Sequence, residues 1–281
     1  MTPQNLTGPP HARVVAVANQ KGGVGKTTSA VNIAAALGQS GQQVLVLDLD
    51  PQGNASTALG VPHHEGVLGA YEVLVDGKDF SDAIQASPDL PGVACLPATI
   101  DLAGAEIELV SMVARERRLA TALSNYLVAS EDGVDIVLID CPPSLGLLTL
   151  NALVAANEVL IPIQCEYYAL EGLGQLLRTV ELVRAHLNPE LAVSGILLTM
   201  SDARTRLSGQ VAEEVRAHFG DAVLQQSIPR SVRLSEAPSH GQTVLTYDSD
   251  SRGAEAYRQA AEEFWRRGRP SGDQATPHAA V

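Results

Sequence analysis

Short apolar runs alternate along the chain with longer segments in which apolar residues recur every three or four positions. The first run covers Arg13–Ala18, ends at Asn19 and is followed by a glycine-rich loop. Similar runs lie at 44–49, 93–96, 136–139, 159–163 and 193–198. Because their residues are apolar at consecutive positions, these runs predict short strands that are buried on both faces.

The segments between the runs have the periodicity of amphipathic helices. The first helix is expected to begin near Lys26, and further helices are expected over 115–129, 146–156, 168–187, 207–219 and 252–265. Strands that alternate with helices predict an α/β fold, with a mostly parallel, twisted sheet covered by helices on both faces.

The domain organisation expected from this pattern is simple. No linker or internal repeat interrupts the pattern, so we expect a single domain over 13–267. Residues 1–12 are expected to form a flexible N-terminal extension, and 268–281 a flexible tail.

The last predicted helix places Ala254, Tyr257, Ala261 and Phe264 on one face. Such a face predicts a helix that docks on the sheet. The alternative is a helix that lies on a membrane surface, and the glutamates on its polar face suit anionic lipid poorly.

The net charge of −13 argues against a protein that coats nucleic acid through its overall field. The distribution is uneven, because residues 1–200 carry 9 basic and 21 acidic side chains, whereas 201–269 carry 10 arginines and 10 acids. A nucleic-acid surface would therefore be a local arginine cluster in the last third. No apolar stretch of membrane-spanning length and no secretory signal is present, so we expect a soluble, cytoplasmic protein.

The strongest chemical signal is the segment 19–28, Asn-Gln-Lys-Gly-Gly-Val-Gly-Lys-Thr-Thr, between the first strand and the first helix. A glycine-rich turn there directs backbone N–H groups and the positive end of the helix dipole at one point, where phosphate oxygens bind. In such loops a lysine at the place of Lys26 reaches the β- and γ-phosphates, and a hydroxyl at the place of Thr27 ligates Mg²⁺. The loop departs from the strict pattern GxxxxGK(S/T), because Gln20 stands where the first glycine is expected and Lys21 adds a second lysine. The segment predicts a P-loop site for a nucleoside triphosphate and Mg²⁺.

Three carboxylates end two of the predicted strands. Asp48 and Asp50 end the second strand, and Asp140 ends the strand over 136–139. Ligands bind outside the carboxyl ends of parallel strands, so these acids can hold the waters of a metal ion or orient an attacking water. The alternative for Asp48 and Asp50 is that they cap the next helix.

Five motifs together, KGGVGKTT, DLDPQGN, IDCPPSLG, PIQCEYYALEG and IPRSVRLSEAPSHG, resemble those of the ParA/Soj family of chromosome- and plasmid-partitioning ATPases. This family belongs to the class with a deviant Walker A loop, which also includes MinD and the nitrogenase iron protein. The resemblance implies a Mg²⁺-dependent ATPase that is a homodimer when ATP-bound and binds double-stranded DNA non-specifically. It further implies a ParB-type centromere-binding partner and a cytoplasmic, nucleoid-associated location.

The resemblance also implies roles for single residues. Lys21 matches the signature lysine that crosses the dimer interface to the partner subunit's nucleotide, and Lys26 and Thr27 match the phosphate lysine and the magnesium hydroxyl. Asp50 matches the acid that positions the hydrolytic water, so the implied catalytic residues are Lys21, Lys26 and Asp50. Asp140 matches the Walker B acid that supports Mg²⁺ through water, with Asp48 as a further candidate. The residues matched to ATP binding are Lys21, Gly22, Gly23, Val24, Gly25, Lys26, Thr27, Thr28, Pro229 and Ser231, the last two beside adenine.

DNA binding in this family uses arginines on late helices and loops. These match Arg204, Arg206 and Arg233, with Arg216 and Arg230 as further candidates. Dimerisation doubles such a patch, and affinity rises steeply with the number of phosphate contacts. The alternative for each arginine is a solvated charge or an internal ion pair.

Two other functions remain to be weighed. A MinD-like membrane-associated ATPase in division-site placement is disfavoured, because residues 269–281 are polar and broken by proline. An iron–sulfur protein is suggested by Cys141 beside the second acidic motif, but a cluster shared by two subunits needs two suitably placed cysteines in each. We therefore expect Cys95, Cys141 and Cys165 to be packing residues.

Overall fold

The computed structural model describes residues 12–130, 133–166, 169–202 and 204–268. The strands are β1 (Arg13–Val17), β2 (Val44–Asp48), β3 (Gln85–Ala86), β4 (Val93–Leu96), β5 (Ile136–Asp140), β6 (Glu158–Gln164) and β7 (Ala192–Thr199). The α-helices are α1 (Lys26–Gln39), α2 (Asn54–Ala58), α3 (Phe80–Ala83), α4 (Leu102–Leu109), α5 (Arg118–Ala129), α6 (Leu147–Ala155), α7 (Ala169–His186), α8 (Arg206–Phe219), α9 (Val232–Glu236), α10 (Val244–Tyr247) and α11 (Arg252–Arg267). A π-helix, η1 (Glu72–Asp76), and two 3₁₀ segments, η2 (Gly220–Ala222) and η3 (Ala237–His240), complete the elements.

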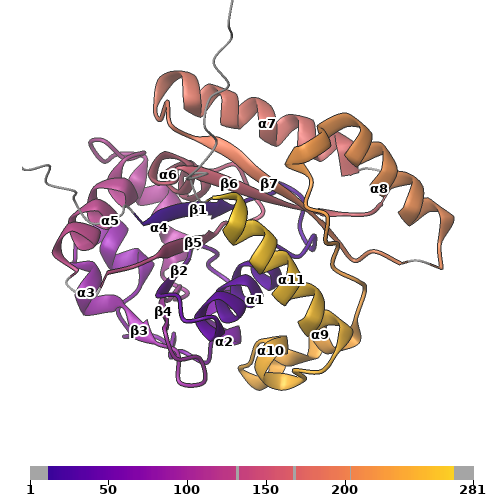
Figure 1. Ribbon diagram of the computed structural model, residues 1–281. Helices are drawn as coiled ribbons and strands as arrows, with labels where there is room; N and C mark the ends of the chain where they lie inside the picture. Colours follow the sequence, from indigo (N-terminus) through magenta and orange to yellow (C-terminus); the bar gives the residue numbers. More distant parts are fainter. Residues whose placement is uncertain (1–11, 131–132, 167–168, 203, 269–281) are drawn as a thin grey trace, which may run out of the picture.

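The strands form one seven-stranded sheet in the order β3-β4-β2-β5-β1-β6-β7 (Figure 1). All pairs are parallel except β3 with β4, which is antiparallel at the edge. From β1 the chain reaches β2 on one side and later β6 on the other. Ligand sites in such sheets lie at the carboxyl ends of the strands where the direction of winding changes. Here that place is the end of β1.

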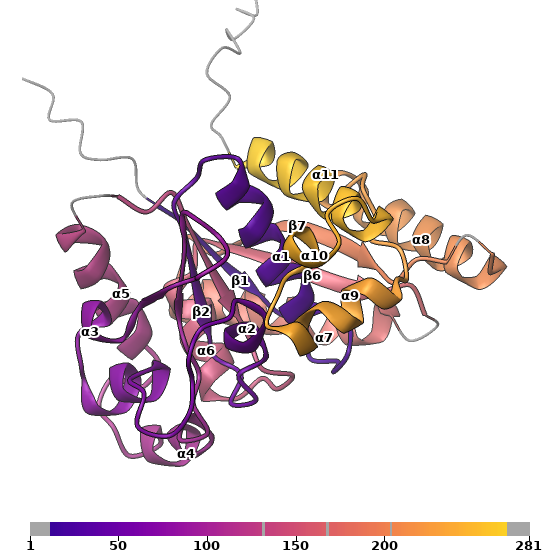
Figure 2. The ribbon, with the colours of Figure 1, turned by 90° about the horizontal axis from the view of Figure 1, so that it is seen from below.

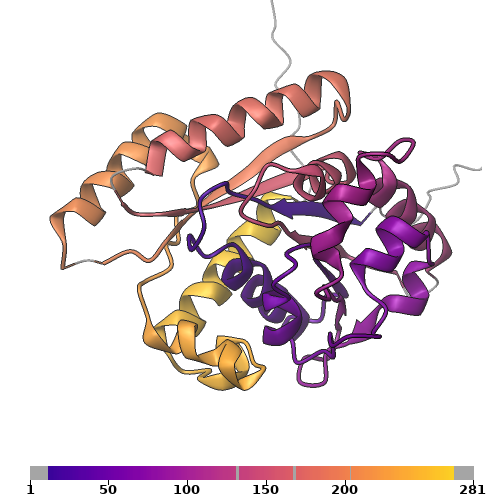
Figure 3. The same ribbon diagram turned by 180° about the vertical axis from the view of Figure 1, so that it is seen from behind.

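Helices cover both faces of the sheet, so the strands are apolar at consecutive positions. In β1, Val14 and Ala16 face one core and Val15 and Val17 face the other. The first core contains η1, α3 and α4 to α8, and the second contains α1, α2 and α9 to α11. Figures 1 and 3 show α7 and α8 on one side of β6 and β7, with α1 and α11 on the other side. Figure 2 shows α3 and α5 at the end of the molecule opposite α8.

The predicted architecture is confirmed, with shifts at the ends of single elements. The helix expected over 115–129 begins only at Arg118, because Ala114 has a positive φ of 51° that ends the preceding turn. The short elements α2, η1, α3, α4, α9 and α10 were not expected, because each has too few residues to show helical periodicity. The proposed extension over 1–12 and tail over 268–281 lie almost entirely outside the described residues.

The predicted docking of the last helix is confirmed. The apolar face of α11, including Tyr257 and Phe264, is buried against α1 and β7. Arg13 links the C-terminal end of α11 to β6. Its guanidinium pairs with Glu158 at 2.7 Å and lies 4.6 Å from the centre of the Phe264 ring.

Two further observations concern membranes and cysteines. Among the described helices, none combines the length and the apolar character that a bilayer crossing requires.

The three cysteines are buried and unpaired, which fits the expected packing role. Burial, with Asp140 close by, raises the pKa of the Cys141 thiol.

Candidate nucleotide site

The glycine loop lies between the end of β1 and the start of α1, as predicted. Gly23 and Gly25 have φ of 73° and 89°, a region that side-chain-bearing residues rarely adopt. The loop is anchored from both sides, because Asn19 Oδ1 accepts from the Lys21 N–H at 3.0 Å and the Thr199 hydroxyl donates to the Val24 carbonyl at 2.8 Å. The fold thus holds the loop open at the N-terminus of a helix of 14 residues, which is where anions bind.

Lys26, the first residue of α1, turns its side chain back into this loop. It is only 6 % exposed, and its ammonium donates to the Lys21 carbonyl at 3.3 Å. Burial lowers the pKa of Lys26, and the nearby Asp140, Cys141 and Asp50 oppose this shift. A largely desolvated cation at the N-terminus of a helix is suited to phosphate.

Asp140 is a fully buried carboxylate at the end of β5. Within the described residues, neither of its oxygens has a hydrogen-bond partner. Burial and the adjacent Asp48 raise its pKa well above the ordinary range, and Thr27 and Lys26 beside it oppose the rise. An orphaned buried carboxylate next to a threonine hydroxyl is a donor set that fits Mg²⁺ and its waters.

Asp48 is the register partner of Asp140 on the neighbouring strand β2, but it is engaged within its own segment. One oxygen accepts from the Ser56 N–H at 2.8 Å and the Ser56 hydroxyl at 2.7 Å, and the other accepts from the Asp50 N–H at 3.2 Å. Burial raises its pKa to about 6. These contacts favour the helix-capping alternative for Asp48 over a metal role.

Asp50 lies at the mouth of the same site. Its Oδ1 accepts from the Gln52 N–H at 3.1 Å, and its carbonyl accepts from Gly53 in a tight turn. Gly53 is required there, since a Cβ would lie 2.8 Å from the His63 ring and 3.0 Å from the Ala98 carbonyl. Asp50 is half-buried and close enough to Lys26 to influence its pKa. A carboxylate so placed can orient a water beside a phosphate held by the loop.

Lys21 points away from the loop that Lys26 fills. Its side chain is 40 % exposed, and its ammonium pairs with Glu166 at 3.2 Å. Glu166 follows the end of β6 and also lies 3.9 Å from Arg230. The sequence analysis assigned no role to Glu166, although its place directly after a strand at this edge of the sheet could have indicated one.

A pocket of about 370 Å³ adjoins the glycine loop on the side of Thr27 and Thr28. Pro229 and Ser231, the two residues that the resemblance matches to the adenine side, line it. Its walls also include residues to which no motif of the sequence assigned a role, among them Val31, Asn32, Thr199, Met200, Ile228 and Leu234. The pocket has both apolar and polar side chains in its walls and the volume of a small-ligand site, and it can hold a flat ring next to a phosphate chain.

Four of the five candidate arginines lie on two neighbouring loops or at the start of the helices that follow them. The loop after β7 carries Arg204 and leads to Arg206, and the loop before α9 carries Arg230 and leads to Arg233. The loops are in contact, since the Arg230 N–H donates to the Ser201 carbonyl at 3.0 Å.

Arg216 lies apart from these four arginines. It is in the last turn of α8, about 15 Å along the helix from Arg206, and donates to the Gln225 carbonyl at 3.1 Å.

Several of these arginines are ion-paired, which is the alternative weighed from the sequence. Arg204 binds both oxygens of Asp202, at 2.9 and 3.0 Å, and lowers the pKa of Asp202 to about 2. Arg233 pairs with Glu236 at 3.1 Å and Asp248 at 3.2 Å. In the described part of the chain, Arg206 is exposed and has no carboxylate within 4.0 Å. It is the most available of the four arginines for a phosphate.

The buried charge of Asp140 leads to a prediction about stability. The reference pKa of the carboxyl is 3.8, and it is raised in the folded state. The folded protein therefore binds more protons than the unfolded chain above that pH, so this group costs stability increasingly as pH rises. We expect Asp140→Asn to raise the melting temperature of the nucleotide-free protein by at least about 3 °C at pH 8, with a smaller gain at pH 5.

Thermal unfolding of both proteins across this pH range checks that prediction. Asp89→Asn, at an exposed acid, is the control, and its melting temperature should stay close to that of the wild type at every pH. A destabilised Asp140→Asn protein, or a gain independent of pH, would contradict it.

Comparisons with known proteins agree with this geometry. Residues 12–193 match the AAA domain family. The chain is 54 % identical over 251 residues to the sporulation initiation inhibitor protein Soj of Bacillus subtilis, with 89 % of this chain and 97 % of that protein covered. It is 51 % identical to the chromosome partitioning protein ParA of Caulobacter vibrioides, with 89 % and 93 % covered.

A solved structure shows the same fold with nucleotide. It is described as cobyrinic acid a,c-diamide synthase from Mycobacterium smegmatis with bound ATP analogue and magnesium. The TM-score is 0.78 and the identity 41 %, with 92 % of this chain and 98 % of that chain covered.

Proposed function

The chain belongs to the ParA/Soj family of chromosome-partitioning ATPases, and on that basis we propose that it is an ATP-driven dimerisation switch on DNA. ATP and Mg²⁺ join two subunits, the dimer binds double-stranded DNA non-specifically, and hydrolysis stimulated by a ParB-type partner releases it. The observation that carries the proposal is a glycine loop with two lysines, one turned inward and one outward, beside an orphaned buried carboxylate.

The inward half of the site is assigned to the subunit's own nucleotide. The N–H groups of 22–28 and the Lys26 ammonium hold the phosphates, and the pocket at Pro229 and Ser231 holds adenine. Thr27 and, through water, Asp140 hold Mg²⁺, which neutralises charge between the phosphates when bound. Asp50 orients the attacking water. Asp48 is assigned to capping, because both of its oxygens are engaged.

The outward half is assigned to the partner subunit. Lys21 is exposed and reaches Glu166 rather than its own loop, so it is free to turn to a second subunit's phosphates. The ion pair it must leave is solvent-exposed and is worth only about 0.2–1 kcal/mol. A cation supplied across the interface links hydrolysis to dimerisation, because neither subunit completes the site alone.

The four arginines on the two loops are assigned to DNA. Each dimer presents them twice, which compensates for the acidic charge of the whole chain. Their carboxylate partners, such as Asp202 and Glu236, must give way to phosphate. The need to break these ion pairs weakens the DNA contacts of the paired arginines, which suits an association that has to be reversible. Binding of this kind would place the protein on the nucleoid.

The name of the mycobacterial structure attributes an amide-forming synthesis to that protein. Its identity to this chain is 41 %, below the 54 % and 51 % of the two partitioning proteins. The proposal therefore follows the partitioning proteins, and nothing in the site's geometry calls for a second function.

The proposed function is tested by DNA binding with ATP, with ADP and without nucleotide, at two salt concentrations. We expect binding of a random-sequence duplex only with ATP, and a steep loss of affinity at the higher salt. Equal binding in all three nucleotide states would contradict the switch.

The Arg206→Ala variant tests whether these arginines form the DNA-binding surface. If a dimer uses both copies of Arg206, the slope of log K against log salt should fall by about 1.8, with the affinity for Mg–ATP unchanged. Arg233→Ala should also lower this slope, but by less, because Arg233 is already ion-paired. Arg178→Ala, at an exposed arginine on α7, is the matched control, and an equal loss there would contradict the assignment to the two loops.

A further inference from the structure

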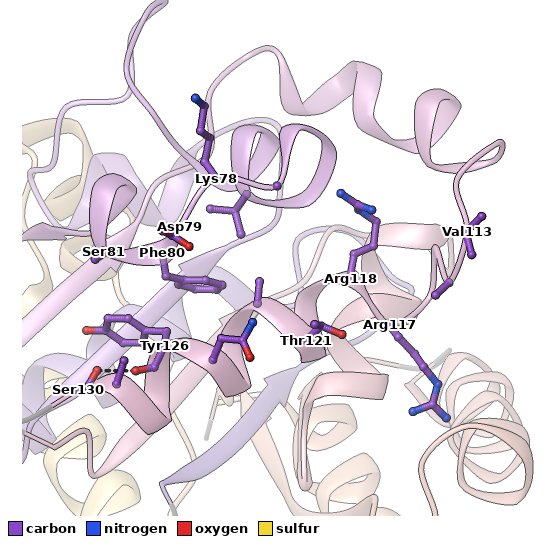
Figure 4. A pocket seen from close by; sticks show the side chains of 16 residues that line it. Lys78, Asp79, Phe80, Ser81, Val113, Arg117, Arg118, Thr121, Tyr126 and Ser130 are labelled. Atoms are coloured by element: carbon purple, nitrogen blue, oxygen red, sulfur yellow. Dashed lines mark hydrogen bonds between the residues drawn. The ribbon is translucent and has the colours of Figure 1, made fainter.

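A second and larger cavity lies far from the glycine loop in the fold. Its volume is about 830 Å³, and it is formed by η1, the start of α3 and one whole face of α5 (Figure 4). These elements belong to the core on the opposite face of the sheet from α1. The cavity shares no lining residue with the pocket beside the glycine loop. The ATP-driven switch proposed above makes no use of it.

The lining of this cavity is basic, although the first 200 residues of the chain are acidic as a whole. Residues 1–200 carry 9 basic side chains against 21 acids, yet Lys78, Arg117 and Arg118 line this one cavity with Asp79 as the single acid among the lining residues. Lys78 is the only lysine of the chain outside the glycine loop. In the described part of the chain, none of the three cations has a carboxylate within 4.0 Å. Their charge is therefore available to an anion.

Arg118 is the inner cation, and it is held in a fixed orientation. Its Nε donates to the Leu74 carbonyl and its Nη2 to the Val75 carbonyl at 3.2 Å, at the end of η1. A guanidinium has five N–H groups, so three remain for a ligand. Figure 4 shows Arg118 across the cavity from Phe80, while Arg117 points away from Phe80. An arginine oriented in this way loses little entropy on binding an anion.

The opposite wall is aromatic. Phe80 is 2 % exposed and stacks on Tyr126, with ring centres 5.7 Å apart and 25° between the planes. Thr121 and Asn125 lie between this wall and the arginines, and in the described structure their side chains make no hydrogen bond. A flat apolar wall, a few unused polar groups and a fixed cation are the composition of a small-ligand site.

The backbone beside the cavity is strained. Ala114, one of the lining residues, has a φ of 51°, and it is one of two non-glycine residues with positive φ in the described chain. Such a conformation costs of order 1–3 kcal/mol and is frequent at ligand sites. Here it sets the turn from which α5 starts and directs Arg117 and Arg118 to their places.

We propose that this cavity binds a small organic anion that combines a flat ring with a phosphate or carboxylate group. The ring lies against Tyr126, which stacks on the buried Phe80, the anionic group meets Arg118 with Lys78 at the rim, and Thr121 and Asn125 supply hydrogen bonds. The aromatic wall and Arg118 lie on opposite sides of one cavity (Figure 4), which a ligand of this kind spans. Inorganic phosphate would contact only the cations and not the aromatic wall.

The test uses the full chain with its glycine loop saturated by Mg–ADP, so that added phosphates cannot bind there. Phenyl phosphate, benzoate and inorganic phosphate are titrated separately, with binding followed by ligand-observed saturation-transfer NMR for the first two and by calorimetry for all three. We expect dissociation constants on the order of 1 mM for the better aromatic anion and at least tenfold weaker binding of inorganic phosphate. Stronger binding of phenyl phosphate or of benzoate decides between phosphate and carboxylate.

Two variants and one control locate the binding. Lys78→Glu reverses the charge at the rim, and Thr121→Trp fills the cavity from an exposed helix position. Each should weaken the aromatic anion at least fivefold, and Arg178→Glu, the same type of charge reversal on α7, should not. Unchanged affinity for Mg–ADP shows that each variant is folded. Wild-type affinity in both cavity variants, an equal loss in the control, or no binding of either aromatic anion at 10-fold the expected dissociation constant would overturn the proposal.

Discussion

Lys21→Ala is expected to abolish ATP-dependent dimerisation and to lower ATP turnover by at least about 10³-fold. Cations supplied across an interface to a phosphoryl-transfer site are worth 10³–10⁵ in rate. The effect should come from the missing partner contact and not from misfolding. In the single subunit Lys21 makes only an exposed ion pair with Glu166, and such pairs contribute about 0.2–1 kcal/mol to stability.

Two measurements check this prediction. Light scattering with saturating Mg–ATP reports the dimer, and phosphate release with saturating DNA reports turnover. The control is Arg178→Ala, at an exposed cation on α7 that lies outside the glycine loop. Wild-type turnover in Lys21→Ala, or dimers at the wild-type ATP concentration, would exclude the role across the interface.

Asp50→Ala is expected to separate binding from hydrolysis. Loss of the carboxylate that orients the water should lower turnover by about 10²–10⁴-fold, while Lys26, Thr27 and Asp140 still bind Mg–ATP. We expect the Asp50→Ala protein to form an ATP-bound dimer that remains on DNA. Asp50 is half-buried and accepts one hydrogen bond, from Gln52, so the loss of folding stability should be only about 1 kcal/mol.

The dissociation of preformed complexes from DNA after addition of excess ADP measures this effect. The half-life should lengthen in proportion to the loss of turnover. Asp89→Ala, at an exposed acid far from the site, should behave as wild type. A monomeric Asp50→Ala protein at saturating ATP would show that Asp50 holds the nucleotide or the interface instead.

Asp140 and Asp48 show where the sequence could not distinguish two residues. Each ends a fully buried strand, and the two are register partners. Asp48 is engaged because Ser56, eight residues later, returns at the start of α2 and binds it with both its N–H and its hydroxyl. Asp140 is followed by two prolines in its loop, and neither of its oxygens is bonded within the described residues. The position of α2, which brings Ser56 to Asp48, therefore decided that Asp140 and not Asp48 is available to a metal ion.

The sequence by itself determined the sheet, because strands that are apolar at every position can only be covered on both faces. It also determined the phosphate loop, since the φ values at Gly23 and Gly25 and the lysine at the helix start are local properties. The tertiary structure alone decided the ion pairs between distant segments. Lys21 meets Glu166 from 145 residues away, and Arg233 in α9 meets Asp248, which follows α10. These pairs form between side chains that the fold brings together, and no period or spacing in the sequence encodes that proximity. The pairs of Arg204 with Asp202 and of Arg233 with Glu236 are different, because their partners lie two and three residues away in the sequence.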